Sequence, residues 1–285
     1  LVAGWGGGGG PAPASTATRS RPDTIAPNIY IRWAQFSSFC GLFLNGGHGE
    51  RRLWLRTPAE LEIIRRFSWL HTELVPYLYS HVVECHRGGR PLMRPLDEGR
   101  YHYLLGDDFL VAPIHADSPR REVALPDGRW RYLFRPSEAP VAGPVRLTRE
   151  FPLDEYPVYL REGALVPLNV TRDYTGLGDR ESAGFRTWLV NPGADGRFTL
   201  WHPETHPEPE STTVAMTGGD PLRIKFSGRR EPHLLRVIAG QRPRSVVLDG
   251  RELTEGAEWT FDQTRGALII RTRDYAQGEY VIRWR

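Results

Sequence analysis

The chain has 285 residues, 40% of them hydrophobic, which is enough to bury a core in more than one domain. Its 37 basic and 34 acidic residues give a formal charge of only +3, and the arginines are scattered among acids, so a nucleic-acid binder is not expected. Two cysteines, Cys40 and Cys85, exclude a disulfide scaffold, and no apolar run is long enough for a membrane helix.

The first 26 residues have the composition of a linker, with a run of glycine from Gly6 to Gly10 followed by alternating proline and alanine. This tract lacks the basic and apolar regions of a secretory signal peptide. We expect residues 1–26 to be either a genuine linker or, as we favour, an artefact of truncation or reading frame. The missing signal and the few cysteines lead us to expect a cytoplasmic protein.

Residues 27 to about 90 are predicted to be helical and rich in aromatic side chains. Apolar residues from Ile29 to Phe43 recur at spacings that place most of them on one helix face. A second helix should begin after Thr57, because Pro58 and Glu60 complete the pattern of a capping box.

Two further signals divide and end this helical region. Pro76 predicts a break in the second helix, since proline removes a backbone donor. Gly88 and Gly89 should then stop the helix.

From Tyr101 onward the sequence predicts short antiparallel strands separated by turn residues. We expect one hairpin from Glu122–Leu125 and Arg129–Phe134, and a second strand pair from Tyr156–Arg161 and Ala164–Leu168.

Regularly spaced strands beyond Asp173 predict a second β-sandwich. They are Arg186–Val190, Arg197–Trp201, Ser211–Met216, Leu222–Phe226, Leu234–Ile238, Ser245–Leu248, Ala267–Arg271 and Tyr280–Arg283.

Motifs for metal, nucleophilic or phosphate chemistry are missing from the sequence. His81 and His86 lie five residues apart, which places them on different faces of a helix, so we expect no metal and no cofactor. Ser37 and Ser38 lack a nucleophile elbow, and Cys40 is most simply a small buried hydrophobe.

Three pairs of neighbouring acids were considered for acid/base catalysis: Asp97 with Glu98, Asp107 with Asp108, and Asp154 with Glu155. Neighbouring residues on a strand point to opposite faces, so none of these pairs is placed to flank one bond. We therefore assign no catalytic residue.

His48 lies in a glycine-flanked loop, with Asn45 before it and Arg51, Arg52 and Trp54 after it. Hydrogen-bonding groups beside an aromatic ring suit the hydroxyls and apolar face of a sugar. On the residues alone, a solvated turn paired with local acids is the favoured alternative.

Six motifs in this order resemble the C-terminal part of glycoside hydrolase family 31, which contains α-glucosidases and α-xylosidases. They cover residues 29 to about 170 and are Ile31–Phe36, Leu74–Tyr79, Gly89–Leu96, Leu105–Ile114, Leu125–Trp130 and Tyr156–Leu168.

The resemblance implies an α/β barrel remnant followed by all-β structure, that is, the end of a (β/α)8 barrel and two antiparallel β-sandwich domains. The expected boundaries are 27–104 for the barrel segment, 105–170 for the proximal sandwich and 171–285 for the distal one. A full barrel takes about 250 residues, so only its last segment is present.

The resemblance also implies a retaining mechanism with two aspartates on barrel segments upstream of Arg32, and no match to either motif precedes that residue. The family's substrate histidine corresponds to His48, and Trp54 and Arg52 are further candidate substrate contacts. The family's arginine two residues before the histidine is Gly46 here, which leaves substrate choice open.

We therefore expect the C-terminal part of a retaining α-glycosidase acting on α-linked glucosides or xylosides, inactive as this fragment, with a glycoside as its partner. One alternative is a non-catalytic carbohydrate-binding protein that uses Trp188, Trp201 and Trp259 as an aromatic strip, although their alternation within strands favours a core position. Another is an inactive remnant that exposes apolar helices and aggregates.

Overall fold

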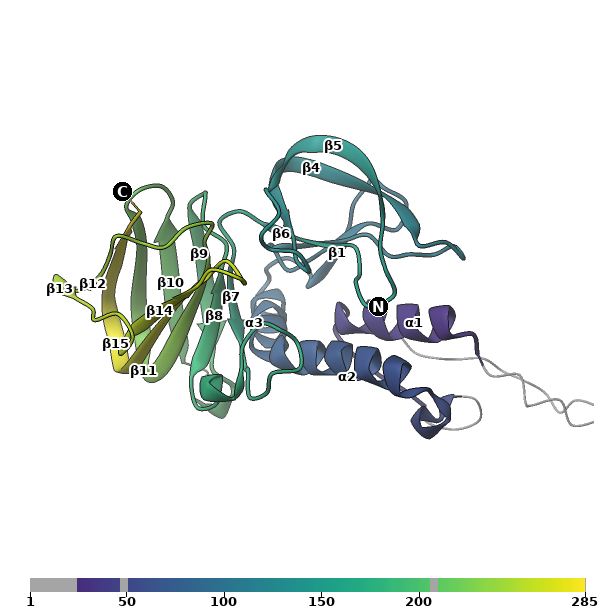
Figure 1. Ribbon diagram of the computed structural model, residues 1–285, viewed down its shortest axis with the longest axis horizontal. Helices are drawn as coiled ribbons and strands as arrows, with labels where there is room; N and C mark the ends of the chain where they lie inside the picture. The colour runs from purple at the N-terminus through teal and green to yellow at the C-terminus, as the bar shows by residue number, and fades with distance from the viewer. Residues whose placement is uncertain (1–24, 47–50, 206–209, 285) are drawn as a thin grey trace, which may run out of the picture.

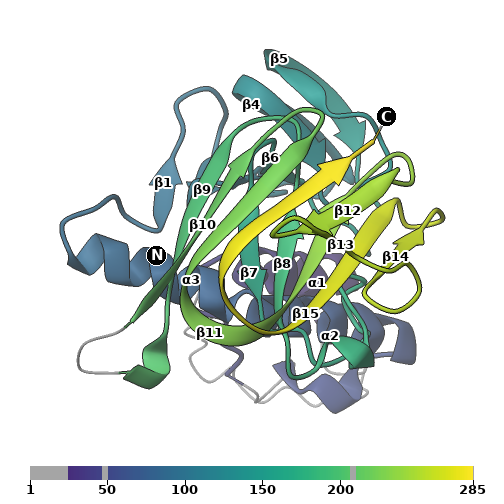
Figure 2. The same ribbon diagram turned by 90° about the vertical axis from the view of Figure 1, so that its left-hand side faces the viewer.

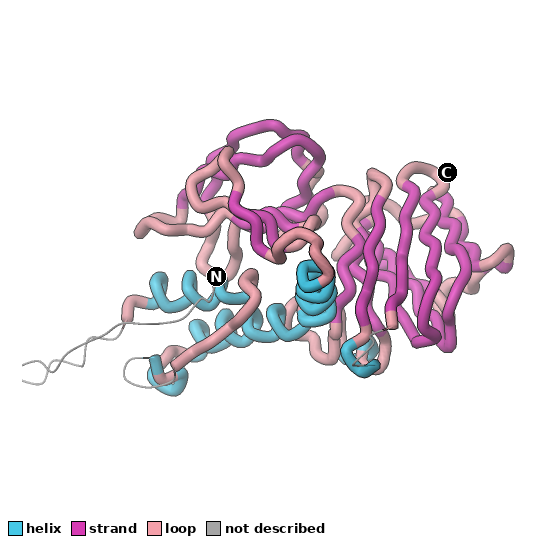
Figure 3. The backbone as a smooth tube through the Cα atoms, turned by 180° about the vertical axis from the view of Figure 1, so that it is seen from behind, coloured by secondary structure: helices cyan, strands magenta, loops and turns pink. Residues whose placement is uncertain are grey.

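The computed structural model describes residues 25–46, 51–205 and 210–284 (Figure 1). Three helices lie along one side of the molecule, a first β-sheet lies over them, and a second, larger β-structure follows at the end of α3 (Figures 1 and 3).

The helices are α1 (Pro27–Ser38), α2 (Pro58–Glu73) and α3 (Val75–His86). The expected N-cap is confirmed, because the Thr57 hydroxyl accepts the Glu60 backbone N–H at 3.3 Å. The second half of the capping box differs, since the Glu60 carboxylate accepts the Thr57 hydroxyl at 3.1 Å.

The break between α2 and α3 falls at Leu74, and Pro76 occupies the first turn of α3, as its missing N–H requires. Gly88, with φ of +91°, lies just beyond the end of α3. The first helix ends at Ser38, earlier than the apolar spacing predicted, and buried Phe39 follows it in a non-helical conformation.

The first sheet has six strands in the order β1-β2-β3-β6-β4-β5, with every pair antiparallel. The strands are β1 (Met93–Pro95), β2 (Tyr103–Leu105), β3 (Phe109–Val111), β4 (Arg120–Tyr132), β5 (Val141–Glu150) and β6 (Val158–Arg161). β4 and β5 arch away from the helices (Figure 1).

The predicted hairpin around Pro126 and Gly128 is wrong. These residues lie within the single strand β4, which pairs with β5 on both sides of a register shift between Leu125 and Gly128. The Pro126 carbonyl accepts the Trp130 indole N–H at 3.0 Å. Turn-type residues here form a bulge in a continuing strand instead of a chain reversal.

The second β-structure has nine strands joined in one hydrogen-bonded sheet. They are β7 (Leu165–Leu168), β8 (Arg186–Val190), β9 (Gly196–Trp201), β10 (Ser211–Thr217), β11 (Leu222–Ile238), β12 (Ser245–Leu248), β13 (Arg251–Glu252), β14 (Trp259–Asp262) and β15 (Ala267–Arg283).

Two long bent strands, β11 and β15, carry this sheet from one layer to another (Figure 2). The first part of β11 pairs with β10, and its last part, from His233 to Val237, pairs in parallel with β8. Register shifts between Ser227 and His233 mark the bend. The sequence predicted each long strand as two short ones, and the gap between them is this corner.

The strand pair predicted from Tyr156–Arg161 and Ala164–Leu168 is also wrong. β6 pairs with β3 and β4, whereas β7 pairs with β8 of the second sheet. The first sheet begins at Met93 and ends at Arg161, and the domain limits of 105–170 stay a prediction.

One continuous hydrophobic core joins the helices to both sheets. It contains Phe67 of α2, Tyr77 of α3, Phe109 of β3 and Trp188 of β8, all fully or almost fully buried. Ser80 of α3 accepts the Trp201 backbone N–H at 3.0 Å, which fixes that helix against β9 (Figure 3).

The aromatic strip of the alternative hypothesis is not formed. Trp188 and Trp259 are buried, and the Trp259 indole donates to the Leu253 carbonyl at 3.0 Å. Trp201 is half-buried beneath the Arg87 guanidinium, 4.0 Å from the ring centroid.

Within the described ranges, no helix is long and apolar enough to cross a membrane. The same ranges contain no cluster of three or more His, Cys, Asp or Glu residues arranged to hold a metal ion.

Candidate functional site

Two of the predicted sugar contacts, Arg52 and Trp54, lie together in the short connection that precedes α2. Trp54 belongs to the 3-10 turn Leu53–Leu55 and is 72% exposed. The Arg52 guanidinium lies 5.9 Å from the centroid of its ring. His48 lies outside the described residues. The described part of the site is therefore an open aromatic face beside a cation, which suits stacking and hydrogen bonding to a polyol.

This connection is fixed to the beginning of α1 through Tyr30. The Tyr30 hydroxyl donates to the Arg51 carbonyl at 2.7 Å and accepts from the Asn45 amide at 3.0 Å. The Arg56 guanidinium covers the Tyr30 ring at 4.0 Å and donates to the Ile25 carbonyl at 2.7 Å. Burial raises the pKa of Tyr30, which keeps it a neutral donor.

The helical side of the molecule leaves several large apolar side chains uncovered. Those with more than a third of their surface exposed in α1 and in the α1–α2 connection are Ile29, Trp33, Leu42, Leu44, Leu53, Trp54 and Leu55. Clustered apolar exposure of this kind is typical of a surface that another protein segment covers.

α1 is held to the first sheet by two polar side chains from the Ile31–Phe36 motif. Arg32 donates to the carbonyls of Glu155 and Phe151, at 2.6 Å each. The Gln35 amide donates to the Leu153 carbonyl at 2.7 Å. The motif therefore docks α1 on the loop between β5 and β6.

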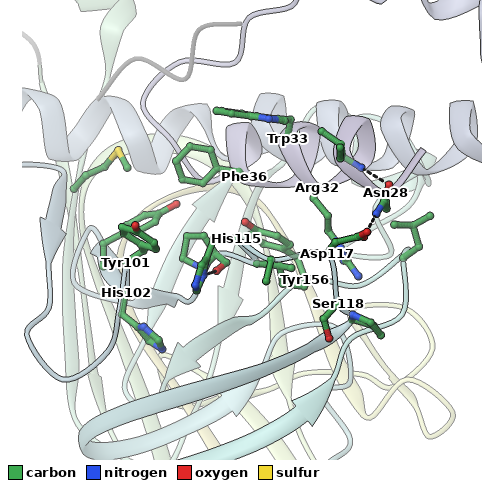
Figure 4. A pocket seen from close by; sticks show the side chains of 18 of the residues that line it. Asn28, Arg32, Trp33, Phe36, Tyr101, His102, His115, Asp117, Ser118 and Tyr156 are labelled. Carbon is green, nitrogen blue, oxygen red and sulfur yellow. Dashed lines mark hydrogen bonds between the residues drawn. The ribbon is translucent and has the colours of Figure 1, made fainter. Parts of the chain in front are cut away.

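A cavity of about 990 Å³ lies between α1 and the first sheet (Figure 4). Trp33 and Phe36 line it from the helix, and Tyr101 and His115 face them from the sheet side with ring centroids 4.9 Å apart. Asp117, which accepts a hydrogen bond from the Asn28 amide, is the one carboxylate among its lining residues. The side chains that line this cavity therefore do not supply the two carboxyl groups that glycoside hydrolysis needs.

Two of the three neighbouring acid pairs carry a carboxylate that is bound by arginine. Asp107 accepts Arg90 at 2.8 Å and Arg94 at 2.6 Å. Its neighbour Asp108 is partly buried, and desolvation together with the Asp107 charge raises its pKa to about 7.

Asp154 and Glu155 are tied to the first sheet, and Asp97 and Glu98 lie in a bend between β1 and β2. Glu155 accepts the Tyr132 hydroxyl at 2.9 Å and the Arg135 guanidinium at 2.8 Å. Asp154 accepts Arg66 through its backbone carbonyl. Glu98 contributes a carbonyl to Arg146.

Glu73, near the end of α2, is a buried acid that the sequence analysis missed. One carboxylate oxygen accepts the Thr175 hydroxyl at 2.6 Å, and the other has no hydrogen-bond partner among the described residues. Burial raises its pKa to about 7. The signal was its position between Leu70 and Leu74, since helical spacing puts all three on one face.

Two family models match consecutive parts of this chain. The family model described as "Glycosyl hydrolases family 31 TIM-barrel domain" matches residues 7–81, and "Glycosyl hydrolase family 31 C-terminal domain" matches residues 89–166. Together they cover more than half of the chain, in the order that the sequence motifs predicted.

Curated relatives include an alpha-xylosidase from Saccharolobus solfataricus, 30% identical over 199 residues, which are 63% of this chain and 26% of the relative. Alpha-glucosidase 2 from Bacillus thermoamyloliquefaciens is 29% identical over 229 residues, 74% of this chain and 28% of the relative. The chain thus spans about a quarter of the length of these relatives.

Among solved structures, a cycloalternan-forming enzyme from Listeria monocytogenes in complex with a pentasaccharide has a TM-score of 0.76 at 20% identity, over 92% of this chain and 28% of that one. A family 31 dextranase from Flavobacterium johnsoniae, complexed with glucose, also has a TM-score of 0.76 at 20% identity, over 90% of this chain and 37% of that one. These likenesses show the fold, and the two family models show the membership: the chain belongs to glycoside hydrolase family 31.

Proposed function

We propose that this chain forms the C-terminal part of a retaining α-glycosidase that hydrolyses α-linked glucosides or xylosides. The observation that carries the proposal is the ordered match of both family models, joined to relatives named alpha-xylosidase and alpha-glucosidase. A relative named 1,6-alpha-glucosyltransferase, 27% identical over 164 residues, makes glucosyl transfer the second candidate reaction.

In this proposal, α1 and α2 are the last helices of the catalytic barrel, and the two sheets are the proximal and distal sandwich domains. The exposed apolar side chains of the α1–α2 connection support it, because barrel helices pack against neighbours on both sides. The Arg32 and Gln35 contacts would then hold the end of the barrel against the proximal domain.

The substrate-contact roles belong to His48, Arg52 and Trp54. The exposed Trp54 ring offers a flat surface to the apolar face of a sugar, and Arg52 beside it offers donors to hydroxyl groups. His48 would donate to or accept from the sugar bound next to the cleaved bond. A glycoside is therefore the proposed partner.

We expect no hydrolysis from the chain alone. Retaining hydrolysis needs two carboxyl groups about 5 Å apart on either side of the bond. Asp107 and Glu155 are engaged with arginines, Asp108 is partly buried beside Asp107, and the cavity between α1 and the first sheet has a single lining carboxylate.

A hybrid enzyme tests the proposal. Residues 27–285 would replace the matching C-terminal part of the Saccharolobus solfataricus alpha-xylosidase, and release of sugar from aryl α-xyloside and α-glucoside would be measured. We expect the hybrid to be active and His48→Ala to lower its activity by at least about tenfold. This is the loss that corresponds to one hydrogen bond to a charged or strongly polar group. The control is His86→Ala, an exposed histidine at the end of α3. A folded hybrid in which both variants behave alike would contradict the role of His48, and products longer than the substrate would favour transfer.

We also infer a cytoplasmic location, supported by two free cysteines, one buried and one exposed. Cell fractionation with an antibody to the chain tests this.

A further inference from the structure

A second cavity lies where α2, the first sheet and the second sheet meet. We name this cavity of about 440 Å³ the arginine cleft. Its lining arginines are Arg66, Arg131, Arg135, Arg236 and Arg265, and Glu138 is the one acid among its lining residues. The inference drawn from it does not depend on the proposed glycosidase function.

The acid does not neutralise the cleft. The Glu138 carboxylate is held in a two-oxygen contact with Arg149, at 2.7 and 2.9 Å, and Arg149 is not among the residues that line the cavity. Arg135 is paired with Glu155 at 2.8 Å and lies 3.7 Å from Glu138, and within the described chain Glu138 forms no ion pair with the other arginines that line the cleft. The cleft therefore keeps an excess of positive charge.

Arg236 is the most buried of these cations. It lies on β11, is 8% exposed, and donates to the Gly176 carbonyl at 3.2 Å. In the described part of the chain, no carboxylate lies within ion-pair distance of Arg236. The two acids that act on it from further away are engaged elsewhere, because Asp262 pairs with Arg265 and Asp179 caps a 3-10 turn.

Arg131 and Arg66 complete the set of arginines that contact only neutral groups. Arg131 donates to the Asn191 side-chain oxygen at 2.9 Å and to the Pro136 and Glu138 carbonyls at 2.8 Å each. Arg66 donates to a backbone carbonyl and lies 5.3 Å from the Phe134 ring centroid.

Burial of a charge among neutral acceptors is costly unless a counter-charge joins it. Burial lowers the pKa of both Arg131 and Arg236, which records this cost. The planar forks of arginine match the oxygens of phosphate, with which they form paired charge-assisted hydrogen bonds.

We propose that the arginine cleft binds a phosphate-type oxyanion, held by Arg236, Arg131 and Arg66. Its volume lies within the range of small-molecule pockets and exceeds what an inorganic phosphate fills, so there is room for a phosphorylated sugar. A bound anion joins the helices, the first sheet and the second sheet, so it stabilises the chain as a unit.

The test is calorimetric titration of the whole chain with three probes at constant ionic strength: sodium phosphate, glucose 6-phosphate and glucose. Thermal unfolding is followed in parallel. We expect saturable binding of a phosphate probe and a Tm that rises with its concentration. Arg236→Met and Arg66→Gln should each weaken binding by about tenfold or more.

Arg223→Gln is the matched control, since it removes one arginine from the same strand while its partner, Glu279, lies on the outer side at 2.9 Å. Should Arg236→Met fail to fold, Arg66→Gln on the helix surface decides the outcome. Tighter binding of glucose 6-phosphate than of phosphate would support a phosphorylated sugar, and equal binding would support inorganic phosphate. The proposal is overturned by absence of saturable binding, by an equal loss in Arg223→Gln, or by glucose binding as tightly as glucose 6-phosphate.

Discussion

Buried acids link the stability of this chain to pH, and Glu73 is the clearest case. Its pKa is raised from 4.5 to about 7, so in that window the folded chain keeps a proton that the unfolded chain has lost. The free energy of unfolding therefore falls as pH rises through the window, by at most about 1.4 kcal/mol per pH unit for one proton.

Glu73→Gln should remove this contribution. The glutamine keeps a partner for the Thr175 hydroxyl and cannot ionise, so the variant should gain stability over the parent as pH rises from 4.5 to about 7. Urea unfolding across that range measures the difference. Glu62→Gln, an exposed position on the same helix, is the control. A difference between parent and Glu73→Gln that stays constant with pH would show that Glu73 ionises normally.

The difference between parent and variant is the quantity to compare because other groups act in the opposite direction. Burial lowers the pKa of three histidines to about 4, which makes the folded state more stable as pH rises toward 6.5. The three are His81, His202 and His233. Since both proteins carry them, their contribution cancels in the comparison.

Long-range contacts determine which polar side chains come together in a site, and these contacts cannot be read from the sequence. Lys225 is the only lysine among 37 basic residues, so arginine is too common here for any one to stand out. Arg236 comes close to Arg131 only because β11 and β4 belong to sheets that meet at α2. The contact between Arg52 and Trp54 is local, and their role as sugar contacts stays a prediction.

The Ile31–Phe36 motif explains how α1 is attached to the first sheet. Arg32→Lys should lower the free energy of unfolding by about 1–3 kcal/mol, because a lysine cannot reproduce the fork that donates to the Glu155 and Phe151 carbonyls. Urea unfolding measures it, with Arg65→Lys as the control at an exposed ion pair. Equal stabilities for the two variants would count against this docking role.

The corner of β11 depends on Gly228. Its φ is +156°, and a Cβ there would lie 2.5 Å from the Thr212 Cα, a backbone atom that cannot move aside. Gly228→Ala should therefore cost about 1–3 kcal/mol or prevent folding. At Gly240 a Cβ meets open space, so Gly240→Ala is the control and should be near neutral. A neutral Gly228→Ala would mean that the corner is looser than described.

Helices were predicted more accurately than strands because their end signals are local. Thr57 and Pro76 determine the limits of α2 and α3 through caps and a missing donor. Strand limits depend on partners. Pro126 and Gly128 look like a turn until β5 pairs on both sides of them, and β7 follows β6 in sequence yet pairs with β8.

In the whole molecule, the helical side carries an exposed apolar face, and the two β-sheets support the helices. The two sheets and α3 share a core, whereas α1 and the α1–α2 connection expose apolar side chains and the open Trp54 ring (Figure 1). In the proposed function, this face is where the rest of a catalytic barrel would pack. The order of the elements was predictable from the motifs. The meeting of α2 with both sheets, where the arginine cleft lies, was not.

The assay of the chain by itself tests the account most directly. Purified residues 1–285 would be incubated with aryl α-glucoside and aryl α-xyloside, and the released aryl alcohol measured beside the His48→Ala variant. The account predicts no release above background, because the described chain does not assemble a carboxylate pair around a substrate. Release that is lost in His48→Ala would contradict it and would place a complete active site within this chain.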